Sequence, residues 1–385
     1  MDLSHKIGRD GMNKADRIRE RHVKSFTMKT LSEHIHIRTG RSKYTGDTVL
    51  AVLVWTAMCH EFVEGVARNL LNVWRMSVPS GDTVRRWIEC LTPGDVRSSL
   101  LSCNSDVLEK ARSMRLLTHP VVCALDCNDR EYYGKKTSGL IVGGKHKNGT
   151  NWFYRIATLC VVEKGIRFEI AAVEYNVFSS LPKVVRRLIE DASRHVRIRH
   201  LLMDRAFSTV EIRHMLTDMG ISYVMPIETN DRIEREVKAT HGLRFRHIEW
   251  VTTFRNITDT TTLIIIDRDE VKQPKHRSSK SVYWLYVTSM SVTDGNVADI
   301  CRFYDARWGI ESGYRIDDHE FTGLTTSHNE SLRLFYLFLS VLLRNIWTLF
   351  KLMLGCTGAV NKAPVEELSA SEFREWFGKE FRSPS

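Results

Sequence analysis

Two short apolar runs, each ending at an aspartate, constrain the fold of this chain more than any other feature. Val121–Leu125 runs directly into Asp126, and Leu201–Met203, the end of a second strand-like segment, runs into Asp204. Such runs are typical of buried strands, and a carboxylate that follows one is costly to bury unless it is paired or binds a cation. A single aspartate of this kind is most often a helix cap or a loop residue. Two of them in one predicted sheet make a metal site an equally good interpretation.

Strand-like and helix-like segments alternate around these two runs. The order over residues 121–227 is three strands followed by helix, strand, helix and strand. The segments after the first run are Trp152–Val162, Ile166–Tyr175, Leu181–Val196, Ile198–Met203, Val210–Met219 and Ile221–Ile227. This order predicts an α/β fold with a mixed sheet flanked by helices. Open α/β sheets bind their ligands at the carboxyl ends of strands, where both aspartates lie.

A candidate DNA-recognition helix lies in the N-terminal part, where residues 45–113 have helical periodicity. Val78–Asp82 has turn and N-cap chemistry, and Arg85 and Arg86 lie opposite the apolar side of the helix that follows. A short helix with an exposed arginine pair after a tight turn resembles the recognition helix of a helix-turn-helix motif. The alternative is a surface helix with two solvated arginines.

These patterns divide the chain into four predicted parts. They are a basic arm with a helical DNA-binding domain at 1–118, an α/β catalytic domain at 119–227 and 297–355, a β-rich insertion at 228–296, and a C-terminal tail at 356–385. The insertion is rich in Thr, Ile, Arg and Val, and helical periodicity returns at residue 297.

The net charge favours a polyanionic partner. The chain has 56 Lys and Arg against 46 Asp and Glu, a net charge of +10, and residues 1–45 hold 11 of the basic and 5 of the acidic residues. Lys145 and Lys147, in a loop near the first aspartate, and the charged segment 272–280 could contact a nucleic acid backbone or simply be solvated.

No membrane or secreted location is expected. The most apolar segment, residues 332–354, is interrupted by Arg333, Arg344 and Lys351, so it predicts a buried helix rather than a membrane span. The N-terminus has no apolar run typical of a signal peptide, and the eight cysteines include no C-x-x-C pair. We therefore expect a reducing, cytoplasmic location.

A third acid, Glu311, lies on a predicted helix. Tyr304, Arg307, Glu311, Arg315 and Asp318 follow one another at spacings of 3, 4, 4 and 3. At ~100° per residue these side chains form one polar stripe. Ion pairs at i,i+4 between the two arginines and the glutamate would by themselves account for this stripe.

The residues around the three acids resemble those of DDE transposases of prokaryotic insertion sequences, specifically the insertion sequence 4 family. That family's glutamate helix has Tyr, two residues, Arg, three residues, Glu, six residues and Lys. Tyr304, Arg307 and Glu311 match this signature. The Lys position is occupied by Asp318, and Arg315, one turn earlier on the same face, is a candidate for the missing cation.

The two aspartates also lie in segments that resemble the family. Leu201–Phe207 matches its pattern of apolar residues, Asp, Arg, a small residue and Phe, and Asp126–Gly134 resembles its first-strand motif. The resemblance covers roughly residues 120–350. It implies that the α/β domain is an RNase H-like mixed sheet whose β-rich insertion separates the second aspartate from the glutamate.

The resemblance further implies a transposase, which cleaves DNA at the ends of its element and transfers the 3′-hydroxyl into target DNA. Asp126, Asp204 and Glu311 would be both the catalytic residues and the metal ligands. All-carboxylate sites suit Mg²⁺ or Mn²⁺, and two ions ~3.5–4 Å apart would hold the scissile phosphate. Arg307 and Arg315 would neutralise phosphates, and Tyr304 would contact a phosphate or stack on a base.

The expected partner is double-stranded DNA, both the terminal inverted repeats of the element and the target, bound by a homodimer in a synaptic complex near the nucleoid. Two alternatives remain open. One is an RNase H-like nuclease without strand transfer, and the other is a catalytically silent DNA-binding protein derived from a transposase.

Overall fold

The computed structural model describes residues 20–117, 120–163, 165–239, 244–251, 257–267, 283–358 and 368–382. The first part of the predicted basic arm and the charged segment 272–280 lie outside these residues. The chain forms two compact units, Met1–Thr118 with Gly313–Ser385, and His119–Ser312.

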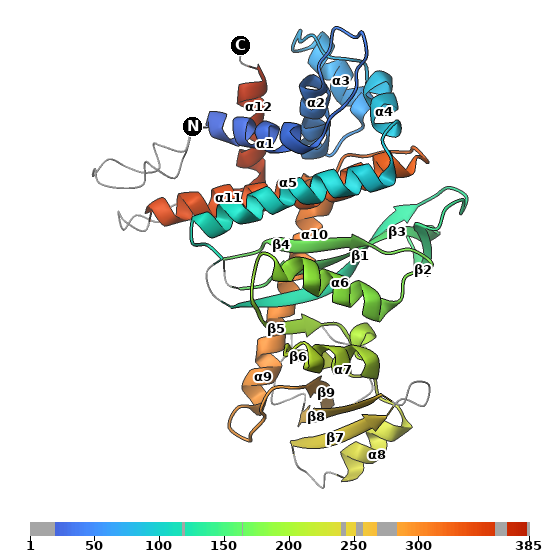
Figure 1. Cartoon of the computed structure of the whole chain (residues 1–385), viewed down its shortest axis with the longest axis vertical. Coiled ribbons are helices and arrows are strands. Elements are labelled where there is room, and N and C mark those ends of the chain that lie inside the picture. Colours follow the sequence, from blue (N-terminus) through green and yellow to red (C-terminus); the bar gives the residue numbers. More distant parts are fainter. Residues whose placement is uncertain are drawn as a thin grey trace. The chain divides into compact units, whose positions relative to one another are not determined.

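The unit His119–Ser312 is built on one mixed nine-stranded sheet (Figure 1). Its strands are β1 (Val121–Tyr132), β2 (Ile141–Lys147), β3 (Thr150–Val161), β4 (Glu169–Glu174), β5 (Ile198–Met203), β6 (Ser222–Pro226), β7 (Phe245–Val251), β8 (Thr258–Asp267) and β9 (Tyr283–Thr288). The order is β2-β3-β1-β5-β6-β9-β8-β7, and β4 also pairs with β3. β1, β5 and β6 are parallel neighbours, and the other pairs are antiparallel. The predicted mixed α/β sheet is therefore confirmed, and its topology is consistent with an RNase H-like fold.

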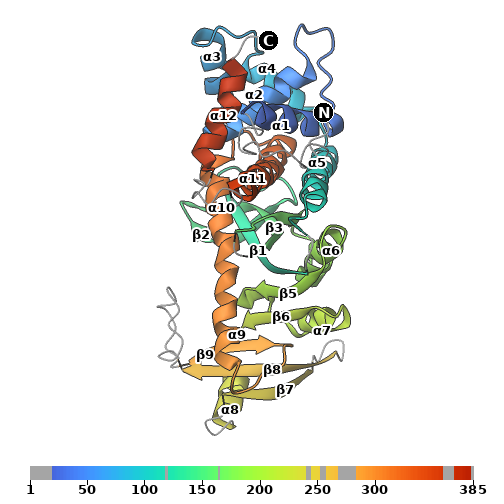
Figure 2. The same cartoon turned by 90° about the vertical axis from the view of Figure 1, so that its left-hand side faces the viewer.

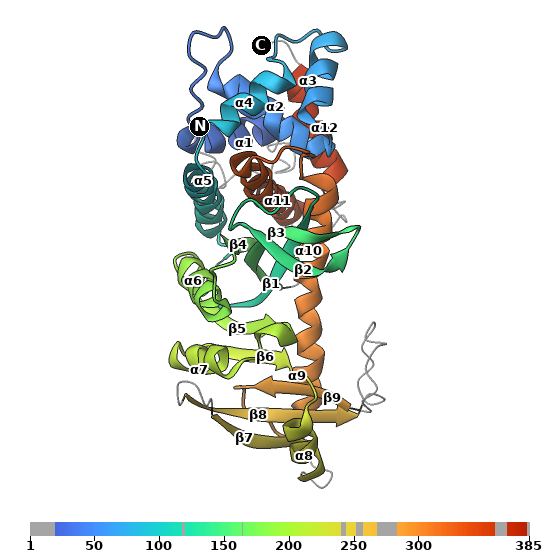
Figure 3. The same ribbon diagram turned by 90° about the vertical axis from the view of Figure 1, so that its right-hand side faces the viewer.

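Helices cover both faces of this sheet. α6 (Leu181–Ser193) and α7 (Val210–Asp218) lie on one face, and α9 (Val297–Tyr304) lies on the opposite one (Figures 2 and 3). The apolar stripe of α6, which includes Val184 and Leu188, is buried against the sheet. Because both faces are covered, the apolar runs of β1 and β5 that precede the two aspartates are buried.

The segment predicted as a β-rich insertion contributes strands to the same sheet. β9 pairs with β6, and β8 and β7 extend the sheet from there. The sequence analysis missed β7, β2 and the short helix α8 (Asp231–Ala239). A buried ion pair, Arg213 Nε to Asp259 Oδ2 at 2.9 Å, fixes α7 to β8, and each side chain is 1% exposed.

The other unit is helical. It contains α1 (Glu20–His34), α2 (Gly46–Cys59), α3 (Val63–Asn72), α4 (Gly81–Glu89), α5 (Pro93–Ser113), α11 (Glu330–Gly358) and α12 (Ala370–Arg382). Thr45, Ser80 and Thr92 cap α2, α4 and α5, because each side-chain oxygen accepts a hydrogen bond from a backbone N–H of the first turn. Helices were predicted within residues 45–113 and at 332–354, whereas α1 and α12 were not predicted.

Among the described residues, one helix is long and apolar enough to cross a membrane. It is the apolar part of α11, and 78% of its most apolar window is buried inside the structure. α11 packs along α5, as Figure 1 shows. This packing is that of a core helix, as the sequence predicted.

The grouping into two units differs from the four predicted parts. Residues 119 to 312 form one unit, whereas α11, which the sequence assigned to the catalytic domain, belongs to the helical unit. Compact units and functional domains need not coincide, so the functional division stays a prediction.

Candidate active site

The two predicted aspartates lie side by side on neighbouring parallel strands. Leu125 of β1 is in register with Met203 of β5, and an aspartate follows each of them. Neighbouring strands are about 4.8 Å apart, so Asp126 and Asp204 begin from adjacent backbone positions. The Oδ1 atom of each carboxylate accepts a hydrogen bond from the next backbone N–H, at 2.8 Å in both cases. Each carboxylate therefore keeps its other oxygen for a further contact.

The segment that carries Glu311 was predicted as one helix, but in the structure it is interrupted. α9 ends at Tyr304, a single 3₁₀ turn spans Asp305–Arg307, and α10 (Trp308–Glu320) begins directly afterwards. A 3₁₀ turn is wound more tightly than an α-helix, so it changes the direction of the side chains that follow it. The turn brings Arg307 towards β1 and β5.

Tyr304 anchors this turn to the sheet. Its hydroxyl donates a hydrogen bond of 3.2 Å to the carbonyl oxygen of Met203, the residue before Asp204, and the side chain is only 3% exposed. The hydroxyl of Tyr304 is buried and bonded to the backbone, so this side chain positions the turn, and its expected contact with DNA stays a prediction.

Arg307 bridges the first aspartate and the glutamate. Its Nη1 donates to Asp126 Oδ2 at 3.1 Å, and its Nη2 donates to Glu311 Oε1 at 2.5 Å. The guanidinium also lies 5.6 Å from the ring of Tyr304 and 5.7 Å from that of Trp308, within the range of cation–π attraction. Arg307 is 5% exposed, so its charge is directed at the two carboxylates instead of at solvent.

The electrostatics of the site reflect crowded negative charge. Burial raises the pKa of Asp126 to about 6, against the opposing effect of Arg307, and Asp204 and Glu311 raise it further. Burial alone would lower the pKa of Arg307, but Tyr304 and the three acids raise it overall, so the guanidinium stays charged. A cation is therefore favoured among these three carboxylates.

The chemistry of these donors fits a hard divalent cation, since all three side chains offer carboxylate oxygens. In the part of the chain that the structure describes, no group of three His, Cys, Asp or Glu side chains is arranged to hold a metal ion. The guanidinium of Arg307 lies between two of the three acids instead. Because the guanidinium occupies the space between Asp126 and Glu311, this position favours a positive charge.

The remaining predicted contacts lie outside this cluster. Arg315 is exposed on α10, and Asp318, at the family's Lys position, is half-buried on the same helix. Lys145 and Lys147 are exposed near the end of β2, and Lys147 Nζ lies 3.0 Å from Glu131 Oε1. Their contacts with DNA stay predictions.

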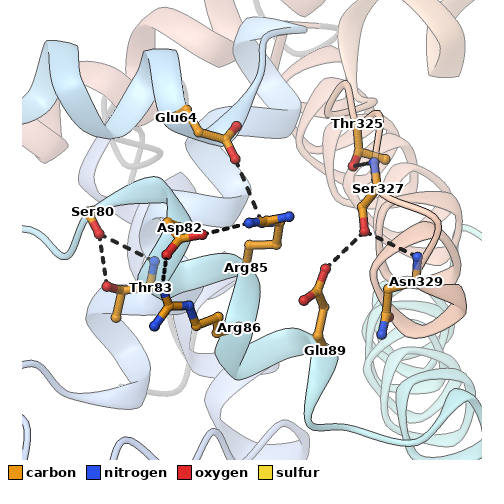
Figure 4. A network of polar contacts seen from close by, with 10 residues as sticks. All are labelled: Glu64, Ser80, Asp82, Thr83, Arg85, Arg86, Glu89, Thr325, Ser327 and Asn329. Atoms are coloured by element: carbon orange, nitrogen blue, oxygen red, sulfur yellow. Dashed lines mark hydrogen bonds and ion pairs between the residues drawn. The ribbon is translucent and has the colours of Figure 1, made fainter.

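The arginine pair of α4 belongs to a local polar network (Figure 4). Arg85 Nη2 donates to Asp82 Oδ1 at 2.6 Å, and its Nε lies 3.9 Å from Glu64 Oε1 on α3. Arg86 pairs with the other oxygen of Asp82 and is exposed. Both arginines thus have acidic partners within the helical unit. A role of this arginine pair in DNA recognition stays a prediction, as does the alternative of a plain surface helix.

Gly309 is a feature of the site that the sequence analysis missed. A Cβ atom at this position would lie 2.8 Å from the guanidinium carbon of Arg167, whose Nη1 donates to the carbonyl oxygen of Glu163. Gly309 is the second residue of α10, and the absence of a side chain there lets the Arg167 guanidinium lie close to the helix that carries Glu311.

Comparison with known families adds evidence of a different kind. A family model described as "Transposase DDE domain" matches residues 146–343, which is just over half of the chain. The matched segment contains Asp204 and Glu311 and begins after Asp126. No curated protein sequence matches the chain significantly.

Proposed function

Because the chain belongs to the transposase DDE domain family, we propose that it is a transposase of the insertion sequence 4 type, which cuts DNA at the ends of its element and joins the 3′-hydroxyl to target DNA. Asp126, Asp204 and Glu311 are the proposed catalytic residues and metal ligands. The spacing of Tyr304, Arg307 and Glu311 supports the finer family assignment, and Asp318 departs from it.

One observation carries this proposal: the guanidinium of Arg307 lies between Asp126 and Glu311, beside the strand that ends at Asp204. A cation is stabilised where these carboxylates face one another. Transposases of this family generally use divalent metal ions. Two Mg²⁺ or Mn²⁺ ions held by the three acids would polarise the scissile phosphate and stabilise the attacking and leaving oxygens.

The chain's own residues prepare this chemistry in separate ways. The backbone N–H groups of Cys127 and Arg205 each orient one aspartate. Burial raises the pKa of Asp126 to about 6, so this carboxyl is mostly ionised at neutral pH and could there hold a cation. The hydrogen bond from Tyr304 to the end of β5 ties the turn before the glutamate helix to the strand that carries Asp204.

The DNA partners follow from this activity. We propose that the protein binds the terminal inverted repeats and the target as double-stranded DNA, acts as a homodimer on paired ends, and works in the cytoplasm on the nucleoid. Arg315, Lys145, Lys147, Arg85 and Arg86 are the proposed phosphate contacts, because DNA-binding proteins neutralise backbone phosphates with basic side chains.

A plasmid that carries the two DNA borders of the protein's own gene tests the proposal. We expect nicking and 3′-end joining with Mn²⁺ or Mg²⁺, no activity with EDTA, and loss of activity in Asp204→Asn and Glu311→Gln with DNA affinity retained. Asp231→Asn, an exposed acid on α8, is the matched control and should cleave as wild type does.

The outcomes separate the alternatives. Metal-dependent nicking without joining of 3′ ends would favour an RNase H-like nuclease. Binding of the borders without any metal-dependent nicking would favour a catalytically silent DNA-binding protein.

A further inference from the structure

A hairpin rich in lysine projects from the first strand of the sheet. We define the lysine hairpin as residues Tyr133–Trp152, which include β2 and the start of β3. It contains four lysines and His146 and has no Asp or Glu. All five of these basic side chains are exposed, and they are Lys135, Lys136, Lys145, His146 and Lys147. The hairpin is thus a concentrated patch of positive charge on the sheet unit.

The lysine hairpin is held in a defined shape. Thr150 Oγ1 donates to the carbonyl oxygen of Tyr132 at 2.6 Å, and the hydroxyl of Tyr133 donates to the carbonyl oxygen of Asn148 at 3.1 Å. Beneath it, Tyr132, Ile141 and Tyr154 form a small buried apolar cluster. These contacts fix the positions of the exposed lysines relative to the strands.

Exposed aromatic rings accompany the lysines. Tyr133 is 70% exposed and Trp152 is 36% exposed, and Lys136 Nζ lies 5.1 Å from the centre of the Trp152 ring. Phe178, in the loop that packs on Gly139 of the hairpin, is 89% exposed. Single exposed apolar residues are common, but rings beside lysines are the combination that holds nucleic acid, because lysines pair with phosphates and rings stack on bases.

We propose that the lysine hairpin is a DNA clamp, that is, a surface that binds the duplex to one side of the cut. This inference rests on the proposed function and adds the place of contact. Tyr133 follows Asp126 by seven residues along β1, which at ~3.3 Å per residue is about 23 Å. On a duplex that runs parallel to β1, with a rise of about 3.4 Å per base pair, this distance corresponds to about seven base pairs from the scissile phosphate. Lys135 and Lys145 bind backbone phosphates, and Trp152 packs on a base exposed where the duplex is distorted.

The test compares the Lys135→Gln/Lys145→Gln double variant with wild type. The matched control is Lys183→Gln/Lys238→Gln, which removes two exposed lysines of α6 and α8 in the same unit. Binding of a labelled duplex, with the gene border placed so that 15 base pairs lie on each side of the cut, is followed by fluorescence anisotropy over a range of salt concentrations.

We expect the slope of log K against log salt to be shallower by about 2 in the lysine double variant and unchanged in the control, since each lost phosphate contact removes about 0.9. Shortening the duplex to four base pairs on the clamp side should abolish the difference from wild type. Trp152→Ala should weaken binding ~10-fold without changing the slope, and Trp152→Phe should restore most of the affinity.

Three results would overturn the inference. They are an unchanged salt slope in the lysine double variant, an equal change in the control, or a difference that persists whichever side of the cut is shortened to four base pairs. If wild type cuts the border with metal but shows one of these results, only the clamp fails. If wild type neither binds nor cuts the border, the proposed function and the clamp fail together.

Discussion

Replacing Asp126 by Asn should remove a pH-dependent loss of stability from the metal-free protein. Raising the pKa of one carboxyl from 3.8 to about 6 makes its ionisation cost about 3 kcal/mol more in the folded state, at about 1.4 kcal/mol per pK unit. Because the folded-state pKa is raised, the wild-type protein loses this stability as the pH rises from about 4 to about 6. Asn carries no charge at any of these pH values, so the Asp126→Asn variant avoids the loss.

The assay is urea unfolding of both proteins in EDTA at several pH values between 3.5 and 8. The free energy of unfolding of the variant minus that of wild type should rise by up to about 3 kcal/mol between pH 4 and pH 7. Asp129→Asn is the matched control on the same strand. Asp129 forms a bidentate pair with Arg155, at 2.6 and 2.8 Å, so this variant should be destabilised at neutral pH. A difference for Asp126→Asn that stays constant with pH would refute the reasoning.

Three further changes test how the structure positions the site. Asp259→Asn should destabilise the protein by about 3–5 kcal/mol in denaturant unfolding, because it leaves the buried guanidinium of Arg213 without its charged partner. Tyr304→Phe should cost about 1 kcal/mol by the same measurement, through loss of its hydrogen bond to the backbone of β5, and should slow cleavage without changing DNA affinity. Gly313→Ala should cost about 1–3 kcal/mol despite its better helix propensity, since its Cβ would collide with the buried guanidinium of Arg344; an unchanged free energy of unfolding would contradict this packing.

The parts of the fold that the sequence predicted are those with a strong local signal. The apolar runs before Asp126 and Asp204 predicted two buried strands, and parallel pairing of β1 with β5 then brings the acids together. The predicted segment Val210–Met219 is observed as α7, which ends at Asp218, two residues before Gly220 with its φ of 66°. In each case a short segment carries enough chemistry to predict its own structure.

The rest depends on contacts between distant segments. β2 contains two glycines and three exposed basic residues, so its apolar pattern is weak, and only pairing with β3 makes it a strand. The strands of the predicted insertion join the main sheet through β6 and β9, a pairing that no local pattern reveals.

The positions of Tyr304 and Arg307 also depend on contacts between distant segments, so the sequence did not predict them. On a continuous helix both would belong to an exposed polar stripe, but the 3₁₀ turn at 305–307 lies against the sheet, so Tyr304 is buried and Arg307 faces the acids. Helical periodicity predicts which residues share a face, whereas the position of a one-turn break depends on packing.

Binding of Mn²⁺, measured by calorimetry on the protein bound to its border duplex, tests the shared metal site most directly. We expect bound metal in wild type and at least tenfold weaker binding in each of Asp126→Asn, Asp204→Asn and Glu311→Gln, with Asp231→Asn unchanged. Metal binding of wild-type strength in all three variants, or in any one of them, would contradict a site formed by the three carboxylates together.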